Sequence, residues 1–310
     1  MRYDDFLTTA ELLADPGLGP EVHQGLARAA GREPRLWRGE VPAGAFVYVG
    51  HGLPAALRTD GLRWFHSTFA GNDAVLRGGD WPPGALLTRT VGRMTERIAQ
   101  YVLGWVLADA QYVPEYVDRQ ARAEWRCVPG ELVAGRLAVV HGTGRIGSAV
   151  GALLGRVGVR TVGVARRPRP VEGFAEVVDA ERADSLLGEA SWIVNVLPLT
   201  PQTEGYFDAR RFGAMRGAMY VNVGRGATTD LAALEAALEA GRVRRAVLDV
   251  VPDEPADPDA LCWRLPHTVV TSHSAGITAD EDVVADFAAC LAALREGRRP
   301  ELTVDVGAGY

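Results

Sequence analysis

The sequence predicts an α/β protein of two domains, of which the second is a doubly wound parallel sheet. Three observations support this prediction. The chain has 310 residues, more than a single hydrophobic core usually organises. From about residue 136, short apolar segments alternate with helical ones, the pattern of a parallel sheet covered on both faces. A last helical segment, 280–294, follows this alternation, so we expect the chain to leave the first domain, build the second and return.

The elements ahead of residue 136 are fewer and less regular. AGAFVYVG (43–50) predicts a short buried strand, and GLRWFHSTFAG (61–71) predicts another that ends in a glycine turn. The segment 93–113 has a helical period and a wide apolar face, and Pro114 is expected to end it. We interpret this helix as the element that crosses between the domains.

The second domain begins with a predicted strand, RLAVVHG (136–142), and a helix over 145–157. Later strands are predicted over 159–165, 190–197, 218–224, 244–250 and 268–273, with a helix over 230–241. Between the first strand and its helix lies GTGRIG, in which Gly142, Gly144 and Gly147 have the spacing Gly-x-Gly-x-x-Gly. A position after a buried strand and before a helix is the one in which this motif binds a dinucleotide.

Each glycine of this motif has a separate expected role. Gly142 permits the tight turn, Gly144 lets the backbone approach a pyrophosphate, and Gly147 lets the helix pack closely on the strand. The free N–H groups at the helix N-terminus would receive the phosphates. The alternative is a glycine turn in a domain that binds no ligand, and the motifs farther along the chain favour the cofactor.

The end of the strand over 159–165 indicates which dinucleotide is bound. An NAD enzyme is expected to carry an acidic residue about 20 positions beyond the glycines, to bind the ribose hydroxyl. Here Ala165 is followed instead by Arg166 and Arg167. Arginine binds a 2′-phosphate through charge-assisted bonds, so NADP(H) is the preferred cofactor and NAD(H) a possible one. The alternative is a solvated basic loop.

Two residues after strand ends have the chemistry to reduce a 2-keto acid. Arg225, in NVGRG, can bind a carboxylate with both arms of its guanidinium and polarise the neighbouring carbonyl, and its alternative is a pair with Asp230. His273, in TSHSAG, is a natural proton donor near neutral pH, although a lone histidine beside a strand is more often structural. The glycines on both sides of Arg225 suggest close approach of a ligand.

Charge and composition exclude other classes of protein. The net charge of −6 gives no electrostatic footprint for nucleic acid, and no apolar run is long enough to span a membrane. The first residues, MRYDDFLTTAELL, contain no signal-peptide core. Cys127, Cys262 and Cys290 are scattered, without disulfide or zinc spacing, so we expect no metal and a cytoplasmic location.

Five stretches together resemble the D-isomer-specific 2-hydroxyacid dehydrogenase family, and most of all its glyoxylate/hydroxypyruvate reductase branch. They are GTGRIG (142–147), NVLPLTPQTEGYFD (195–208), YVNVGRGA (220–227), LDVVPDEP (248–255) and TSHSAGIT (271–278). FAGND (69–73), LTRTVG (87–92) and the closing GY (309–310) extend the likeness, which covers the chain from about residue 60 to its end. The first forty residues match poorly, because MRYDDFLTTA is not the apolar strand with which the family opens.

The resemblance implies two Rossmann-like doubly wound parallel-sheet domains with a cleft between them. Residues 1–90 and 278–310 would form the discontinuous substrate domain, and residues 91–277 the dinucleotide-binding domain. The catalytic residues implied are Arg225, His273 and Glu254, the acid directly before Pro255, which pairs with the histidine and fixes its tautomer.

The resemblance also implies the contacts with the ligands. The residues expected to hold the substrate are Ala70, Gly71, Asn72, Arg225 and His273. Together with the reasoning from the glycine loop and the arginines, the residues expected at the cofactor are Gly142, Thr143, Gly144, Arg145, Ile146, Gly147, Arg166, Arg167, Leu197, Pro198, Thr203, Asn222, Val223, Gly224, Asp249 and Gly276.

Three functions are compatible with these patterns. The first is an NAD(P)H-dependent 2-hydroxyacid dehydrogenase that reduces a small 2-keto acid of the glyoxylate or hydroxypyruvate class. The second is a non-catalytic dinucleotide-sensing regulatory protein, and the third is an NAD-dependent dehydrogenase of a related small acid. The presence of both Arg225 and His273 favours the first. The helix over 93–113 is either a strut between the domains or part of a homodimer contact.

Overall fold

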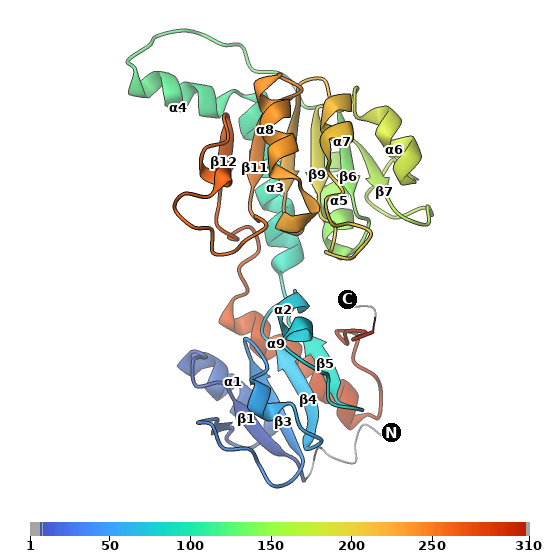
Figure 1. Cartoon of the computed structure of the whole chain (residues 1–310). Helices are drawn as coiled ribbons and strands as arrows, with labels where there is room; N and C mark the ends of the chain where they lie inside the picture. Colours follow the sequence, from blue (N-terminus) through green and yellow to red (C-terminus); the bar gives the residue numbers. More distant parts are fainter. Residues whose placement is uncertain (1–6, 8, 308–310) are drawn as a thin grey trace. The chain divides into compact units, whose positions relative to one another are not determined.

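A computed structural model describes residue 7 and residues 9–307 of the chain (Figure 1), so the GY at 309–310 lies outside the described residues. The described chain forms two compact units. Unit 1 comprises the described residues of Met1–Met94 and Thr278–Tyr310, and unit 2 comprises Thr95–Ile277. Each unit contains one parallel sheet with helices on both faces, which confirms the predicted α/β fold class.

The sheet of unit 1 has five strands in the order β2-β1-β3-β4-β5, and all neighbouring pairs are parallel. This order is that of a doubly wound sheet, because strands are added on both sides of β1 and β3. The strands are β1 (Glu11–Ala14), β2 (Arg35–Leu36), β3 (Phe46–Gly50), β4 (Leu62–Ser67) and β5 (Leu86–Arg89).

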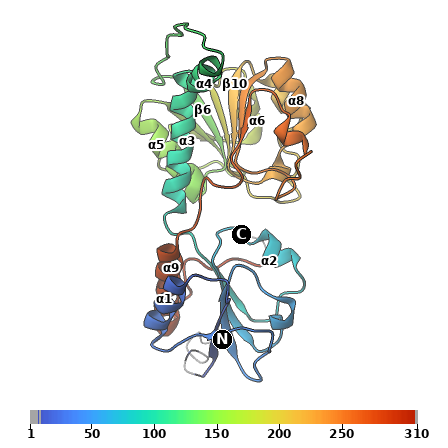
Figure 2. The same cartoon turned by 90° about the vertical axis from the view of Figure 1, so that its left-hand side faces the viewer.

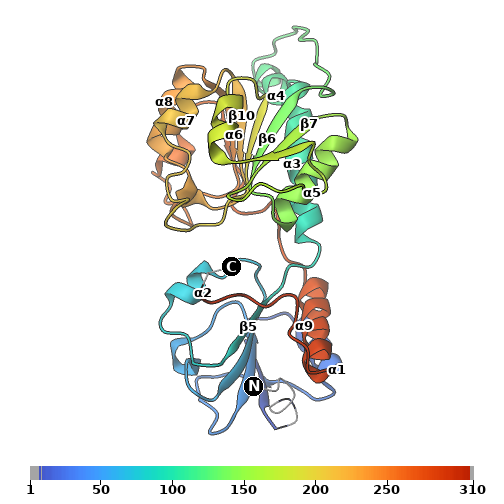
Figure 3. The ribbon, with the colours of Figure 1, turned by 90° about the vertical axis from the view of Figure 1, so that its right-hand side faces the viewer.

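The helices of unit 1 cover its sheet unequally. Figure 2 and Figure 3 show α1 (Pro20–Ala30) and α9 (Asp280–Arg295) together on one face, with the short α2 (Asp73–Arg77) on the other. Trp64 of β4 stacks on Phe287 of α9, with ring centroids 5.0 Å apart. This contact buries two large aromatic side chains where the returning end of the chain packs on the first sheet, so α9 is part of the core of unit 1.

The sheet of unit 2 has seven strands in the order β12-β11-β10-β9-β6-β7-β8, again all parallel. The strands are β6 (Leu137–His141), β7 (Arg160–Val164), β8 (Glu176–Val178), β9 (Trp192–Asn195), β10 (Ala218–Asn222), β11 (Val243–Leu248) and β12 (Thr268–Val270). The strand order reverses between β6 and β9. Ligands of doubly wound sheets bind at such a switch point, beyond the carboxyl ends of the strands.

The helices of unit 2 form a layer on each face of its sheet. They are α3 (Met94–Ala110), α4 (Val113–Ala121), α5 (Arg145–Arg156), α6 (Ala180–Leu186), α7 (Ala209–Ala214) and α8 (Leu231–Glu239). Figure 2 and Figure 3 show α3 and α5 on one face and α6, α7 and α8 on the other. Asp179, Asp208 and Asp230 cap α6, α7 and α8 by accepting bonds from first-turn N–H groups, which explains where these helices begin.

Two expectations about the elements of the fold were wrong or incomplete. Pro114 does not end the long helix: α3 ends at Ala110, Tyr112 turns the chain with a φ of 54°, and Pro114 lies in the first turn of α4. Proline is tolerated there because the first-turn N–H has no partner within the helix. The poorly matching first forty residues do contain a strand, β1, which the sequence reasoning missed because only ELLA forms it.

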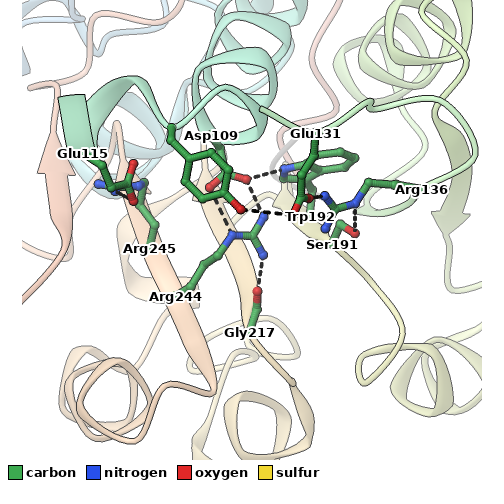
Figure 4. Close-up of polar contacts among 10 residues, drawn as sticks. Asp109, Glu115, Glu131, Arg136, Ser191, Trp192, Gly217, Arg244 and Arg245 are labelled. Carbon is green, nitrogen blue, oxygen red and sulfur yellow. Dashed lines mark hydrogen bonds and ion pairs between the residues drawn. The ribbon is translucent and has the colours of Figure 1, made fainter. Parts of the chain in front are cut away.

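A polar network fixes α3 and α4 to unit 2 (Figure 4). Asp109, at the end of α3, accepts a bond from Trp192 Nε1 at 2.8 Å and forms an ion pair with Arg244, which in turn donates to the Gly217 carbonyl. Arg245 pairs with Glu115 of α4 at 2.7 Å. The carboxylate of Asp109 is nearly fully buried, so these bonds, and not solvent, satisfy it.

Replacing Asp109 with alanine is therefore expected to destabilise the protein. The variant leaves the Trp192 N–H and much of the Arg244 charge buried without a partner, which costs about 3 kcal/mol and lowers the Tm by roughly 5–10 °C. Thermal unfolding followed by circular dichroism measures the change. The matched control is Glu124→Ala, which removes an exposed partner of Arg122 and should leave the Tm at the parent value. Equal Tm values for the two variants would contradict the role of the network.

Candidate active site

The glycine loop lies between β6 and α5, as expected. Gly142 has a φ of 110°, a left-handed conformation that favours glycine. A Cβ on Gly147 would lie 1.9 Å from the Gly142 carbonyl oxygen, so the turn closes only on glycine. A Cβ on Gly144, by contrast, would meet nothing within 4 Å. The packing of the protein therefore explains Gly147, while Gly144 faces open space where the backbone can approach a ligand.

The arginines that follow β7 are exposed. The strand ends at Val164, and Arg166 and Arg167 come directly after Ala165 at the same edge of the sheet as the glycine loop. In unit 2 the pairing of β6 with β7 brings His141 opposite Val164, so the two loops leave adjacent strands side by side. Binding of a ribose 2′-phosphate by these two arginines stays a prediction.

Two neighbouring strands end in the same Asn-Val turn. Asn195 ends β9 and Asn222 ends β10, and the two residues pair in the sheet register. The side chain of each accepts a bond of 3.0 Å from the N–H two residues on, that of Leu197 or Gly224. These amides therefore shape the loops beyond the strands. Asn222 was predicted as a cofactor contact; its side chain is buried and supports the loop of Arg225, and a contact with the cofactor stays a prediction.

Arg225 lies in the loop beyond β10 and is partly buried. Its carbonyl accepts bonds from Asn222 Nδ2 at 3.2 Å and Thr228 Oγ1 at 2.6 Å, which fixes the backbone under the guanidinium. The packing of the protein gives a further reason for the glycines on both sides of Arg225. A Cβ on Gly224 would lie 2.6 Å from the Leu197 carbonyl oxygen, and one on Gly226 would lie 1.9 Å from the Val251 carbonyl carbon. Close approach of neighbouring protein loops is enough to require both glycines, and approach of a ligand stays a prediction.

His273 and Glu254 meet beyond the ends of β12 and β11. The distance from His273 Nδ1 to Glu254 Oε2 is 2.7 Å, and Glu254 Oε1 accepts a bond of 2.9 Å from the Val251 N–H. The His273 side chain is 56% exposed and that of Glu254 is 34% exposed. The carboxylate is therefore held by the protein, while the imidazole remains accessible to a ligand. The bond to Nδ1 leaves Nε2 as the ring nitrogen that can face a substrate.

The charges around this pair favour its ionised form. The hydrogen bond and charge of Glu254 raise the pKa of His273 against the opposing effects of burial and Arg225. Burial alone would raise the pKa of Glu254, but the bonds from His273 and Val251 and the charge of Arg225 hold it below its usual value. Burial lowers the pKa of His66 and His141 to about 3, so these two histidines stay neutral. Of these three histidines, His273 alone has a pKa raised above its ordinary value, which suits a proton donor near neutrality, and that role stays a prediction.

Asp249 directly follows β11, in the segment that leads to Glu254, and its side chain forms hydrogen bonds within the protein. Its Oδ1 accepts bonds from Thr271 Oγ1 at 2.6 Å, Ser274 N at 2.8 Å and Ala275 N at 3.0 Å. The carboxylate is buried and holds the segment that carries His273. Asp249 was predicted as a cofactor contact, and that role stays a prediction. The sequence did not identify Thr271 as a functional residue, although it lies in the TSHSAG motif.

The remaining cofactor candidates lie at the same edge of the unit 2 sheet. Leu197 and Pro198 follow β9, and Thr203 closes their loop by donating to the Pro198 carbonyl at 2.6 Å. The other members of this set are Thr143 in the glycine loop, Arg145 and Ile146 in the first turn of α5, Val223 and Gly224 beyond β10, and Gly276 beyond β12. The sheet therefore gathers into one region residues that are up to 134 positions apart, from Gly142 to Gly276.

The predicted substrate loop, Ala70–Asn72, lies beyond β4 in unit 1. Asn72 is nearly fully buried and its Nδ2 donates to the Ala70 carbonyl at 3.3 Å. Arg89 Nη1 donates to the same carbonyl at 3.3 Å. Because Asn72 is turned into the protein, its Oδ1 is buried with no hydrogen-bond partner among the described residues. The loop is shaped by these contacts, and its role toward a substrate stays a prediction.

The sequence from residue 103 to residue 275 matches the family model described as "D-isomer specific 2-hydroxyacid dehydrogenase, NAD binding domain". This span is more than half of the chain and includes the glycine loop, Arg225, Glu254 and His273. The chain belongs to the D-isomer-specific 2-hydroxyacid dehydrogenase family. The predicted family and enzyme class, a D-2-hydroxyacid dehydrogenase type of oxidoreductase, are thereby confirmed.

Individual relatives agree with this assignment. The chain is 52% identical over 274 residues to a Streptomyces coelicolor protein described by its position in the mprR 3′ region, covering 88% of this chain and 98% of that protein. It is 31% identical to glyoxylate/hydroxypyruvate reductase A of Serratia proteamaculans, covering 78% of this chain and 79% of the relative.

Solved structures resemble the described fold. One is the D-isomer specific 2-hydroxyacid dehydrogenase of Xanthobacter autotrophicus Py2 in complex with NADPH, with a TM-score of 0.85, 27% identity, and coverage of 97% of this chain and 100% of that one. Another is the NADPH-dependent glyoxylate/hydroxypyruvate reductase of Sinorhizobium meliloti in complex with NADP, with a TM-score of 0.83, 28% identity, and coverage of 97% and 100%. The predicted nearness to the glyoxylate/hydroxypyruvate reductase branch is confirmed.

Within residues 7 and 9–307, no helix is both long and apolar enough to cross a membrane.

Proposed function

We propose that the protein is an NADPH-dependent reductase of a small 2-keto acid of the glyoxylate or hydroxypyruvate class. The observation that carries the proposal is the 2.7 Å bond between His273 and Glu254, with Arg225 near enough for its charge to act on both groups. The proposed proton donor, His273, and the proposed carboxylate-binding cation, Arg225, both follow the carboxyl ends of strands in one sheet. These are the two groups that reduction of a 2-keto acid needs from the protein.

In the proposed reaction, each side chain has one task. The guanidinium of Arg225 binds the substrate carboxylate and polarises the adjacent carbonyl. When bound, the nicotinamide supplies the hydride. His273 Nε2 gives its proton to the carbonyl oxygen as that oxygen becomes a hydroxyl, and Glu254 stabilises the imidazolium before the transfer and holds the ring in place. In oxidation of the hydroxy acid, neutral His273 takes the proton back.

The geometry of the glycine loop suits a dinucleotide. Open space at Gly144 and the first-turn N–H groups of α5 fit a pyrophosphate, and the exposed Arg166 and Arg167 fit a 2′-phosphate. The relatives from Xanthobacter and Sinorhizobium are described as complexes with NADPH or NADP, which supports this choice of cofactor. NAD(H) remains the poorer alternative. Substrate binding by Ala70–Asn72 is part of the proposal.

A substrate panel tests the proposed function. Purified protein is mixed with 2-keto acids of increasing side-chain size, each with NADPH and with NADH, and oxidation of the cofactor is followed at its absorbance. We expect the highest kcat/KM for glyoxylate or hydroxypyruvate with NADPH. Binding of NADPH without turnover of any 2-keto acid would overturn the proposal and favour the regulatory alternative. Turnover of a small acid with NAD alone would favour the third function.

The double substitution Arg166→Ala/Arg167→Ala is expected to reverse the preference for the cofactor. Loss of two charge-assisted contacts with the 2′-phosphate should raise the KM for NADPH by roughly a hundredfold, whereas the KM for NADH changes little. The matched control is Arg160→Ala, an exposed arginine at the other end of β7. Initial rates with both cofactors measure the effect. A parent enzyme that prefers NADH would contradict the assignment of these arginines.

We also propose that the protein is a homodimer. Exposed apolar side chains gather on α3, α4 and the segment that follows: Leu107, Val113, Tyr116, Val117, Trp125 and Leu132. Figure 1 shows α4 and this segment projecting from the sheet of unit 2. A second copy of the chain would cover this apolar surface. Sedimentation at micromolar concentration should give a dimer for the parent and a monomer for Val117→Ser/Trp125→Ser, with Trp263→Ser as the control. A monomeric parent would overturn this proposal.

A further inference from the structure

The segment that carries His273 has an unusual backbone. Ser272 and His273 both lie in the left-handed region, with φ values of 52° and 59°. Residues other than glycine rarely adopt this conformation, and two in succession persist only where surrounding contacts hold them. The position of the imidazole therefore depends on what fixes residues 271–277.

The buried carboxylate of Asp249 holds the middle of this segment. Besides the three bonds to its Oδ1, the main-chain oxygen of Asp249 accepts a bond of 2.6 Å from the His273 N–H. The Thr271 hydroxyl donates its hydrogen to Asp249 Oδ1, at a distance of 2.6 Å. Thr271 Oγ1 can then only accept from a further partner.

That further partner comes from α3. Tyr101 Oη lies 2.7 Å from Thr271 Oγ1, and since the threonine hydrogen is already used, the phenol is the donor. Burial raises the pKa of Tyr101 to about 12, so the phenol keeps its hydrogen at physiological pH. One turn earlier on the same face of α3, Arg97 Nη1 donates to the Ile277 carbonyl at 3.1 Å. The helix thus holds both ends of the segment 271–277.

We propose that Tyr101 is a positioning residue, which acts through Thr271 and Asp249 to hold the imidazole of His273 on Glu254. This inference rests on the proposed function, because the position of His273 matters for turnover only if it donates the proton. The charged groups that face the imidazole are Glu254, Asp249 and Arg225. A segment that relaxes would lengthen the bond to Glu254, so both turnover and the proton affinity of His273 would change.

Two substitutions remove the hydroxyl groups that link Tyr101, Thr271 and Asp249 with little change in the shape of the side chains. Thr271→Val is expected to lower kcat for 2-keto acid reduction by roughly tenfold, and Tyr101→Phe by roughly threefold, with little change in the KM for NADPH. Thr271→Ser keeps the hydroxyl and should restore the parent kcat. The matched control is Thr268→Val on β12, whose hydroxyl bonds only to the Pro266 carbonyl, at 3.1 Å, among the contacts of the described chain.

A readout independent of turnover separates this inference from the proposed function. NMR titration of the protein with labelled histidine, with the His273 signal assigned from His273→Gln, gives the pKa of the imidazole. We expect a lower pKa in Thr271→Val and Tyr101→Phe than in the parent and in Thr268→Val. An unchanged pKa together with an unchanged kcat in both variants would overturn the inference. If the parent reduces no 2-keto acid, the proposed function fails while the titration still tests the positioning.

Discussion

Replacing His273 with alanine is expected to lower the turnover of 2-keto acid reduction by about a hundredfold to ten-thousandfold, the usual contribution of a positioned general acid. The Kd for NADPH should stay near the parent value, because the residues proposed to bind the cofactor, the glycine loop and the arginines after β7, are unchanged in this variant. Stopped-flow measurement of a single turnover, with NADPH binding measured separately by fluorescence, tests the two parts of this expectation. His23→Ala in α1 of unit 1 is the matched control.

The same assignment predicts how turnover depends on pH. Glu254 raises the pKa of His273 above its ordinary value of 6.5, so the imidazole is protonated below that value and loses its proton as the pH rises through the raised pKa. The rate of reduction should therefore fall as the pH rises above the pKa of His273, and the rate of oxidation of the hydroxy acid should increase over the same range. In Glu254→Gln, the alkaline fall in reduction should move to lower pH. Near-parent turnover in His273→Ala, or an alkaline limb unmoved in Glu254→Gln, would refute the assignment.

Replacing Arg225 with lysine is expected to lower kcat/KM for the 2-keto acid by roughly fifty- to a hundredfold. Lysine keeps the positive charge but loses the planar pair of donors that can bind both carboxylate oxygens, and a charge-assisted bond is worth about 1.5–3 kcal/mol. Most of the loss should lie in KM if the arginine binds substrate and transition state equally, and in kcat if it also polarises the carbonyl.

Steady-state kinetics of Arg225→Lys with the best 2-keto acid measure this effect. Arg210→Lys is the matched control, since Arg210 is an exposed partner of Asp184 on the α7 side of unit 2 and should tolerate the exchange. An Arg225→Lys enzyme with the parent kcat/KM would show that the arginine does not bind the substrate. Its loop would then have a structural role only.

The sequence predicts much of unit 2 because each signal there is strong and local. Strands such as Leu137–His141 are continuous apolar runs, and the helix Leu231–Glu239 follows a capping aspartate. The residues Arg225, Glu254 and His273 each lie in a short motif after a strand. The prediction that strand ends share one edge of a parallel sheet requires only the alternation of strands and helices.

What the sequence could not predict depends on contacts between distant residues. β1 has only four residues, too few for a periodicity, and forms because β2 and β3 pair with it. Tyr101 and Thr271 are in contact although they are 170 positions apart, and the sequence around each residue carries no pattern that predicts this contact. The end of α3 was misjudged because a proline can open a helix as well as end one. The signal for Asn195 was present in the repeated Asn-Val at two strand ends, but became readable only with the sheet register.

The fit between Gly226 and Val251 has a consequence for how this enzyme can change. Because the backbone at residue 251 occupies the space where a side chain at 226 would lie, the segments on either side of this contact cannot diverge independently. A mutation that enlarges residue 226 becomes tolerable only after the turn leading to Glu254 has shifted. Laboratory evolution toward bulkier substrates should therefore vary both segments in one library, since single-site libraries at either segment would return few folded variants.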